Sequence, residues 1–427
     1  MITVKGTCII PADEKTGIVN IKKSYLYNEG LELVEEQDIA RESDYTNEKR
    51  RRVSHDNGRN FGEWEPVEAT DLSKYYGSDE IIYCDTPRRF NPVHSHYVYT
   101  HWSRYFVDGH KDAYKKYWGE GKRSFYDHQY ISVAQDGTSE PLTTKLVRYE
   151  EGHDFSEENP SDPEFLVKNM GYINEPSVLS SGDIAVPVGV PVDKLCELFG
   201  LDVNEIFPTC PEIHLGVMVA RGKFDKEKGE YDFTFSNPVI LDDLRSSRGI
   251  DEPIVTELTS GRLILVMRGS NVRSANWRTR IKEGTPTYKW FAYSDDGGKT
   301  FSLAEPWSFE GGEPIYSAAT ISKFIRSTKN GKLYWIGNMS DEKAYGNFPR
   351  FPLYIAEVDD TTGLLKKETL TVIDTRREGD TAKVQLSNFS VYEDRESLDI
   401  VVHLAKVGQV DADRPFIGES WRYDITV

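Results

Sequence analysis

Short runs of β-branched and aromatic residues alternate with turn-forming Gly, Asp and Asn along most of the chain. Such runs begin at Asp183, Arg262, Lys332 and Leu398. Alternation over a few residues between turn signals is typical of strands joined as antiparallel hairpins. One stretch, residues 191–199, has helical spacing instead, with Asp193 placed to cap its start. The pattern therefore predicts an all-β protein with little helix.

A phrase of strand, turn and second strand recurs along the chain. It reads Asn174-Glu-Pro-Ser-Val-Leu, then Asp251-Glu-Pro-Ile-Val-Thr-Glu-Leu, each followed by a glycine turn, and weaker copies begin at Glu313 and Leu386. A period of about 60 to 80 residues suits a four-stranded propeller blade with long loops, and this chain holds about six such periods. We therefore expect a six-bladed β-propeller of four-stranded antiparallel sheets.

The two ends of the chain carry strand patterns that suit each other. Residues 421–427 alternate, and residues 1–10 could pair beside them, which would close the ring of blades and remove two free sheet edges. No linker-like stretch divides the sequence, and residues 150–163, rich in Asp, Glu, Ser and Pro, suit a surface loop. We therefore expect a single propeller domain over residues 1–427.

Two short motifs carry a family resemblance. Residues 294–301, Ser-Asp-Asp-Gly-Gly-Lys-Thr-Phe, match the Asp-box pattern Ser-x-Asp-x-Gly-x-Thr-aromatic, and residues 54–61 depart from it only by Asn60 for Thr. Asp and Ser side chains in such a turn hydrogen-bond its amides and Gly takes the positive φ, so Asp56 and Asp296 are expected to be structural. Two Asp boxes (BNR repeats) on a repeat of strands resemble the sialidase superfamily of six-bladed propeller glycosidases.

The resemblance implies candidate catalytic residues, because sialidases use an arginine triad for the sugar carboxylate, a tyrosine nucleophile polarised by a glutamate, and an aspartate acid/base. Glu252, followed by Arg268, is similar to the segment that supplies the glutamate and one triad arginine. Arg350 lies in a segment that looks like the source of another arginine. Asp44, shortly before the first Asp box, resembles the acid/base.

The chain also departs from the family pattern. The opening Arg-Ile-Pro of sialidases reads Ile9-Ile10-Pro11, and Leu386 stands where the family places its tyrosine. Tyr316, in an earlier repeat, is the substitute nucleophile by local sequence. A true sialidase is therefore not expected.

A second group of candidates lies between residues 87 and 130, where five of the nine histidines occur among many aromatic rings. Neutral imidazoles can act as general bases near pH 7, and rings can stack on sugars. His96 is a candidate catalytic residue. The candidate substrate-binding residues, beside Arg268 and Arg350, are Arg89, His94, His101 and Glu175. The alternative for the histidines is plain burial, and for Glu175 a Glu-Pro motif shared by all repeats.

The charge of the chain limits its partners. Lys and Arg number 52 against 70 Asp and Glu, a formal net charge of −18, which repels nucleic acid and anionic membranes. Arginines at the expected funnel would attract an anion locally, so we expect an acidic glycan as substrate. The histidine segment lacks a carboxylate at ligand spacing, so no metal and no cofactor are expected, and the four separated cysteines suit reduced thiols. Since residues 1–6 show no leader pattern, a cytoplasmic protein is expected, or a secreted or periplasmic one if a leader was removed.

Three functions fit these observations. The first is a sialidase-like glycoside hydrolase with Glu252 and Asp44 as its carboxylate pair. The second is a polysaccharide lyase on uronate-containing glycans, motivated by His96, Tyr97 and Arg89. The third is a carbohydrate-binding propeller that has lost catalysis.

Overall fold

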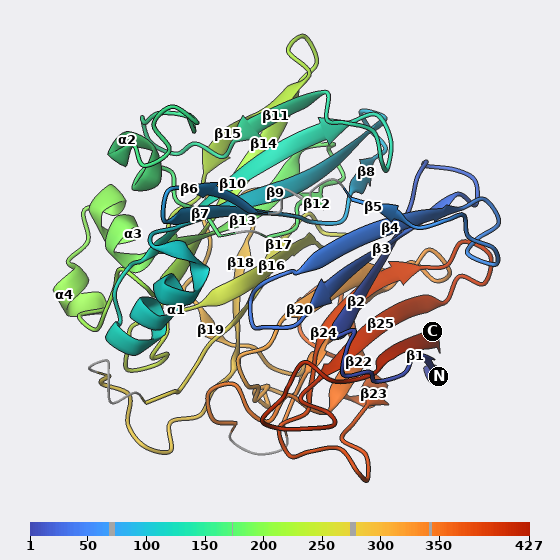
Figure 1. Ribbon diagram of the computed structural model, residues 1–427. Helices are drawn as coiled ribbons and strands as arrows, with labels where there is room; N and C mark the ends of the chain where they lie inside the picture. Colours follow the sequence, from blue (N-terminus) through green and yellow to red (C-terminus); the bar gives the residue numbers. More distant parts are fainter. Residues whose placement is uncertain (68–72, 173, 274–278, 341–343) are drawn as a thin grey trace. The chain divides into compact units, whose positions relative to one another are not determined.

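The computed structural model describes residues 1–67, 73–172, 174–273, 279–340 and 344–427 (Figure 1). The chain forms two compact units. Unit 1 comprises Met1–Thr70, Pro286–Lys289 and Pro306–Val427, and unit 2 comprises Asp71–Thr285 and Trp290–Glu305. The described residues form six sheets, all antiparallel, of which five have four strands and one has six.

Unit 1 holds three of the four-stranded sheets. The first is β2 (Ile18–Tyr25), β3 (Leu33–Ala40), β4 (Glu48–Ser54) and β5 (Glu65–Pro66). The second is β20 (Ser322–Arg326), β21 (Leu333–Asn338), β22 (Leu353–Val358) and β23 (Thr371–Asp374), with the 3-10 helix η2 (Lys367–Thr369) before its last strand. The third contains β24 (Gln385–Glu393), β25 (Ile400–Val407), β26 (Ser420–Thr426) and β1 (Thr3–Ile10).

The third sheet joins the two ends of the chain, as the sequence predicts. Its strand order is β1-β26-β25-β24, and Thr3 lies opposite Thr426 in antiparallel register. Figure 1 marks both termini at this sheet. The first strand therefore covers the edge that β26 would otherwise expose.

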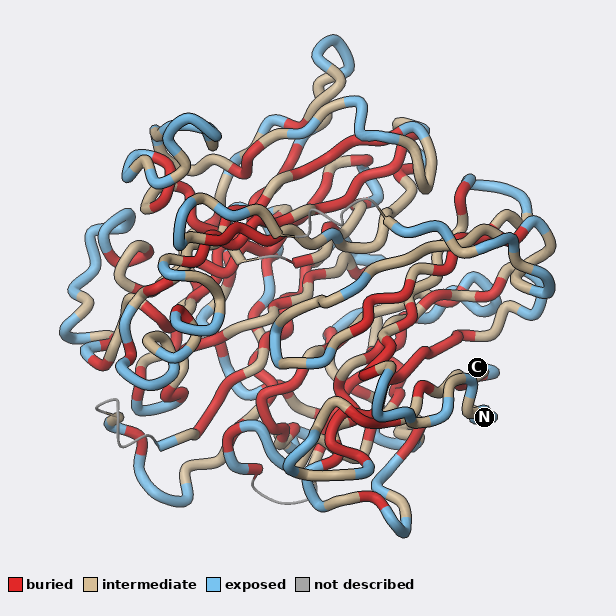
Figure 2. The backbone as a smooth tube through the Cα atoms, viewed as in Figure 1, coloured by how far each residue is buried: buried red, intermediate tan, exposed pale blue. Residues whose placement is uncertain are grey.

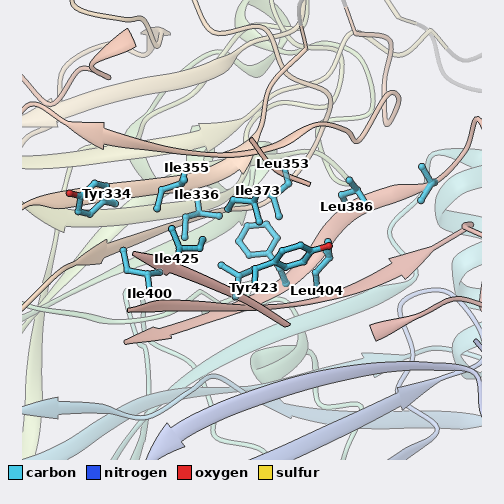
Figure 3. Close-up of a cluster of buried hydrophobic side chains, with 13 residues drawn as sticks. Tyr334, Ile336, Leu353, Ile355, Ile373, Leu386, Ile400, Leu404, Tyr423 and Ile425 are labelled. Carbon is cyan, nitrogen blue, oxygen red and sulfur yellow. The ribbon is translucent and has the colours of Figure 1, made fainter. Parts of the chain in front are cut away.

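A large hydrophobic core of unit 1 lies between the second and third sheets. Figure 3 shows its aliphatic side chains packed around Tyr423, with Ile336 and Ile355 from one sheet and Ile400 and Leu404 from the other. Every residue of β25 is buried, and buried residues likewise concentrate in the middle strands of the sheets in Figure 2. Near-continuous apolar runs such as this one are what the sequence pattern identifies as strands.

Unit 2 holds the six-stranded sheet and two of four strands. The first contains β6 (Ser73–Tyr76), β7 (Asp79–Asp85), β8 (Arg89–Asn91), β9 (His96–Phe106), β10 (Phe125–Ala134) and β11 (Thr143–Leu146). The next is β12 (Ser177–Val178), β13 (Ile184–Pro191), β14 (Leu215–Asp225) and β15 (Glu230–Phe235). The last, which lies largely in this unit, is β16 (Asp251–Glu257), β17 (Leu263–Arg268), β18 (Lys289–Ser294) and β19 (Glu305–Pro306).

Helices are short and all four α-helices of the described residues are in unit 2. They are α1 (Gly109–Glu120), α2 (Pro163–Leu166), α3 (Val192–Phe199) and α4 (Val203–Ile206). The helix predicted at residues 191–199 is α3, but Asp193 does not cap it. Pro191 is the N-cap residue, and the Asp193 carboxylate accepts a hydrogen bond from Arg123 Nη2 at 2.7 Å instead. In the described residues, no helix has the length and apolar character needed to cross a membrane.

The two Asp-box turns have the hydrogen bonds expected from their sequences. In the first, Ser54 Oγ donates to Asp56 Oδ1 at 2.8 Å, and the Gly58 amide, at φ 79°, donates to Ser54 Oγ at 2.8 Å. In the second, the Thr300 amide donates to Asp296 Oδ1 at 2.9 Å. These bonds are local, so the aspartates hold turns. None of the four cysteines forms a disulfide.

Candidate functional site

Glu252 lies at the start of β16 in a strained backbone conformation. Its φ is +44°, in the left-handed region that non-glycine residues rarely adopt, and the register of β16 against β17 shifts between Asp251 and Ile254. Pro253 has no N–H and cannot continue the ladder, which explains why the irregularity falls there. Strain of this kind is concentrated at functional sites, so it marks Glu252 as a candidate.

Arg268 binds Glu252 from the neighbouring strand. Its Nη1 donates to Glu252 Oε2 at 2.6 Å, and its Nη2 donates to Asp251 Oδ2 at 2.8 Å. The three side chains are 15–23% exposed. Burial lowers the pKa of Arg268, but the Glu252 and Asp251 carboxylates outweigh burial and raise that pKa above its usual value. Arg268 is therefore already occupied by two carboxylates of its own chain.

Arg248 lies just before β16 and is half-buried. Its segment is fixed on both sides, because the Ser247 amide donates to Ser270 O at 2.8 Å and the Ile250 amide donates to Leu215 O at 2.9 Å. The Arg248 guanidinium lies over the Trp118 ring, 4.5 Å from its centroid. Burial, and then the charge of Arg268, lower the pKa of Arg248. Among the described residues, none forms a hydrogen bond or an ion pair with this guanidinium.

A second ion pair joins β9 and β10 in the same unit. Arg104 lies opposite Asp127 in the register, and its Nε and Nη2 donate to the two Asp127 oxygens at 2.7 and 2.9 Å. Its Nη1 donates to Tyr114 Oη at 2.9 Å. Burial raises the pKa of Asp127, although the Arg104 charge acts against that rise, and the nearby Asp251 carboxylate adds to it. Arg104 therefore has carboxylate and phenol partners for three of its nitrogens.

Tyr172 connects the two ion pairs. The Arg104 guanidinium lies 5.4 Å from its ring centroid, and the Trp102 ring meets it edge to face at 5.9 Å. Burial raises the pKa of Tyr172, and the negative charges of Glu252 and Asp251 raise it further. We call this group the charged cluster, and its six ionic members are Arg104, Asp127, Arg248, Asp251, Glu252 and Arg268. It is a set of fixed charges within unit 2, bordered by aromatic rings.

Two of the sequence-predicted residues, Glu252 and Arg268, lie in the charged cluster, and two others pair with each other. Arg89, in β8, donates from Nη2 to Glu175 Oε2 at 2.6 Å. The Arg89 side chain is 40% exposed, so this is a pair near solvent. Both residues belong to unit 2, and their mutual contact explains their positions without a ligand.

His94 and His96 lie far from the charged cluster. Eight positions of β9 separate His96 from Arg104, roughly 26 Å of extended strand. His96 is buried, its Nε2 is 2.8 Å from Tyr231 Oη, and its pKa is lowered to about 4 by burial and by the nearby His94. Phe224 packs on both rings, 4.9 Å from His94 and 4.4 Å from His96. Plain burial, the alternative left open by the sequence, accounts for these contacts.

His101 lies between these two places on β9. Its ring stacks on Tyr130 at 4.7 Å, and its Nδ1 is 3.2 Å from Ser132 Oγ. Burial lowers the pKa of His101, which favours the neutral imidazole. The neighbours given by these contacts are side chains of its own sheet.

Asp44 and Tyr316 belong to unit 1. Asp44 is exposed in the turn between β3 and β4, at φ +57°, and accepts a hydrogen bond from Ser43 Oγ at 3.0 Å. The Tyr316 ring is half-buried and stacks on Tyr288, with the centroids 5.3 Å apart. The structure therefore provides an accessible carboxylate and a supported phenol in this unit.

Arg350, also in unit 1, donates three hydrogen bonds to neutral acceptors. Its Nη1 donates to Gln385 Oε1 at 2.7 Å and lies 3.3 Å from Ser387 Oγ, and its Nε donates to Asn347 O at 3.0 Å. Leu386, between the two polar residues, is fully buried in the core of Figure 3. At the position where the resemblance predicts a tyrosine, the chain therefore presents an inaccessible aliphatic side chain.

Sequence reasoning missed Arg248, Arg104 and Asp127. A weak signal exists for Arg104, since a lone cation in the aromatic run His96–Phe106 needs a buried partner. Arg248 precedes the repeat phrase by three residues and has no distinguishing pattern of its own. In the parts of the chain that the structure describes, no group of three His, Cys, Asp or Glu side chains is arranged to hold a metal ion.

Comparison with known proteins relates the chain to others by fold. No protein-family model matches it, and no curated protein does. Solved structures do match. The sialidase of Trypanosoma rangeli is 11% identical with a TM-score of 0.52 over 99% of this chain and 59% of that one. A mutant NanB sialidase of Streptococcus pneumoniae is 10% identical with a TM-score of 0.55 over 98% and 70%.

A third similar structure is the intramolecular trans-sialidase of Ruminococcus gnavus in complex with oseltamivir carboxylate. It is 11% identical, with a TM-score of 0.50 over 95% of this chain and 94% of that one. The chain spans 59% of the length of the trypanosome enzyme. At these identities the likeness concerns the fold, and it confirms the predicted class, an all-β six-bladed propeller like that of sialidases. One sheet carries two strands more than predicted.

Proposed function

We propose that this protein is a glycoside hydrolase that acts on an acidic or related sugar of a glycan, and that it is not a true sialidase. The observation that carries the proposal is Glu252, a carboxylate in a strained backbone, bound by Arg268 at 2.6 Å and half-buried beside Arg248. Fixed charges in a water-poor site can stabilise the charge that develops when a glycosidic bond breaks.

Three features argue against sialidase chemistry as the family performs it. Leu386, where the resemblance predicts the nucleophile, is fully buried, and no arginine stands in Ile9-Ile10-Pro11. Arg268, the best match to a triad arginine, binds Asp251 and Glu252. A different arrangement of groups must therefore perform the reaction.

The proposed roles follow from position and charge. Glu252, paired with a guanidinium, suits the group that acts as a carboxylate, either as base or in support of a nucleophile. Asp44, exposed in its turn, is proposed as the acid/base, and Tyr316 as the nucleophile if the enzyme retains configuration. An inverting enzyme needs only two carboxyl groups about 6.5 to 9.5 Å apart, with water as the attacking group.

Turnover by the purified protein tests this function. The protein is incubated with glycans that carry sialic acid, uronic acid, sulfated or neutral terminal sugars. Proton NMR detects the released sugar and shows which of its two anomers forms first, which distinguishes retention from inversion of configuration. We expect release of an acidic sugar, and a loss of about 10²- to 10⁴-fold in kcat for Glu252→Gln. Glu257→Gln, at the other end of β16, is the matched control and should retain activity. Activity that survives Glu252→Gln unchanged would refute the assignment.

A non-catalytic carbohydrate-binding propeller is the second candidate, favoured by the buried Leu386. It predicts glycan binding that survives Glu252→Gln, with no turnover of any sugar. The lyase alternative depends on His96, Tyr97 and Arg89, and the burial and lowered pKa of His96 speak against a base there. A lyase would also generate the ultraviolet absorbance of an unsaturated uronate, which the same incubations can detect.

A further inference from the structure

Three arginines of the charged cluster differ in what they bind. Arg104 donates to both Asp127 oxygens and to Tyr114, and Arg268 donates to Asp251 and Glu252. Arg248 alone among the three has neither a carboxylate nor any other hydrogen-bond acceptor in the described residues. The protein's own acceptors therefore occupy two of the three guanidinium groups of the charged cluster, and Arg248 is the third.

We propose that Arg248 binds the anionic group, a carboxylate or a sulfate, of the sugar that this site accepts. The inference rests on the proposed function and assigns its substrate recognition to a residue that the sequence does not single out. Arg268, by contrast, positions Glu252 and does not bind the anion.

The geometry around Arg248 leaves its donors available. The guanidinium lies over the Trp118 ring at 4.5 Å, so the ring occupies one face, whereas the N–H groups of a guanidinium point outward in its plane. The backbone on either side is fixed by Ser270 and Leu215, which limits the freedom that ligand binding would remove. An anion can therefore meet a preorganised fork of N–H donors.

The electrostatics also favour an external anion. A partly buried guanidinium without an acceptor loses hydration and gains no hydrogen bond in return. The positive charge of Arg268 acts in the same unfavourable direction. The charges of Asp251 and Glu252 act in the favourable direction, but neither residue accepts a hydrogen bond from Arg248. A carboxylate or sulfate would supply the missing acceptor, and planar two-point binding suits either group.

The experiment compares several acidic sugars, each with a matched neutral sugar, because the proposal fixes the anionic group and not the identity of the sugar. Binding is measured by NMR titration with N-acetylneuraminate, D-glucuronate and N-acetylglucosamine 6-sulfate. Each is paired with its neutral counterpart, the methyl ester or the unsulfated sugar, and inorganic sulfate serves as the free anion. We expect at least one acidic sugar to bind the wild type, and Arg248→Gln to weaken that binding about 10- to 100-fold while the neutral counterpart binds equally to both.

Arg245→Gln is the matched control. Arg245 lies on the same segment and also covers a tryptophan, Trp290 at 4.7 Å, but it is exposed and its Nη2 donates to Ala304 O at 2.9 Å. We expect this variant to bind the acidic sugar as the wild type does. Arg248→Gln should melt close to Arg245→Gln, because each substitution removes one cation–π contact with a tryptophan and neither breaks an ion pair.

Several results would overturn the inference. They are equal binding of the acidic sugar by wild type and Arg248→Gln, no binding of any acidic sugar by the wild type, binding of inorganic sulfate alone, or a melting temperature of Arg248→Gln well below that of Arg245→Gln. The hydrolase proposal fails separately. Arg248-dependent binding without turnover of any glycan would contradict hydrolysis and support the anion site.

Discussion

Arg268 holds two carboxylates that the fold places side by side. Asp251 and Glu252 are consecutive, and the +44° φ of Glu252 brings both side chains to the same guanidinium. A left-handed conformation at a non-glycine residue costs roughly 1–3 kcal/mol, so the surrounding contacts must offset it. Arg268 supplies those contacts and is therefore a positioning residue for Glu252.

Removing Arg268 should destabilise the protein strongly. Arg268→Gln leaves two partly buried carboxylates without their cation, and we expect a loss of about 3–5 kcal/mol in the free energy of unfolding. Arg89→Gln is the control, since it breaks a single pair near solvent and should cost at most about 1 kcal/mol. Urea denaturation of both variants measures the difference. Equal decreases in the free energy of unfolding for the two variants would contradict the role of Arg268 in holding the two carboxylates.

Buried histidines make stability depend on pH. His128 is fully buried against Phe165, 4.0 Å between ring centroids, and burial lowers its pKa to about 4, against about 6.5 in an unfolded chain. Between these values the folded state binds fewer protons than the unfolded state. The stabilisation of the folded state by the neutral, buried His128 is therefore fully present above pH 6.5 and is lost as the pH falls towards 4.

The corresponding measurement compares unfolding free energies at pH 7 and pH 4. His128→Gln should lose less stability than the wild type over this interval, by about 3 kcal/mol. His153 is the control because it is exposed and its pKa is raised, first by the hydrogen bond that its ring donates to the Asp162 carboxylate. The stabilisation that protonated His153 gives the folded state is present at low pH and is lost as the pH rises. Because His153→Gln lacks this stabilisation, the variant should lose more stability than the wild type on acidification. A His128→Gln slope equal to that of the wild type would contradict this account.

At the scale of elements, the Asp-box turn between β18 and β19 is a structural device. Asp296 accepts hydrogen bonds from the Thr300 amide and hydroxyl, at 2.9 and 2.7 Å, and from Ser294. Asp296→Ala should lower the free energy of unfolding by about 1–3 kcal/mol without changing kcat. Asp295→Ala, which removes only the pair with Arg262, should have a smaller effect. Loss of activity in a folded Asp296→Ala protein would place the turn in the site.

The sequence predicts elements well where burial imposes a pattern. The strands β13, β17, β21 and β25 are all recognised, because each is a nearly continuous buried run between turn residues. The two-residue strands β5 and β19 are too short to show alternation, whereas the equally short β12 is found through the repeated phrase that contains it. Helix α1 escapes prediction because only Ala113 of its twelve residues is buried, which leaves no apolar stripe.

The candidate site is only partly predictable for a related reason. Glu252 and Arg268 can be named from a family-like segment, since both lie on adjoining strands of one repeat. Arg248 is a candidate because no described residue accepts a hydrogen bond from its guanidinium. Asp127 is a candidate because it pairs with Arg104 on the neighbouring strand. Pairing depends on register and on side-chain direction in three dimensions, which a hydrophobic pattern does not encode.

At the scale of the whole molecule, the net charge of −18 opposes the approach of an acidic glycan. Local positive charge must therefore overcome that field at the site. Arg104 and Arg268 already donate their hydrogen bonds to carboxylates of the protein, so Arg248 is the arginine of the charged cluster whose N–H groups are left for an incoming anion. The absence of an acceptor for Arg248 among the described residues is thus the local feature that would allow an acidic glycan to bind to an acidic protein.

A crystal structure of Glu252→Gln soaked with the acidic sugar that binds in solution tests the central claim most directly. We predict electron density for the sugar at the charged cluster, with its carboxylate or sulfate oxygens within hydrogen-bond distance of the Arg248 guanidinium and its anomeric carbon facing residue 252. Density for the sugar at any place without contact to Arg248 and residue 252 would contradict the account.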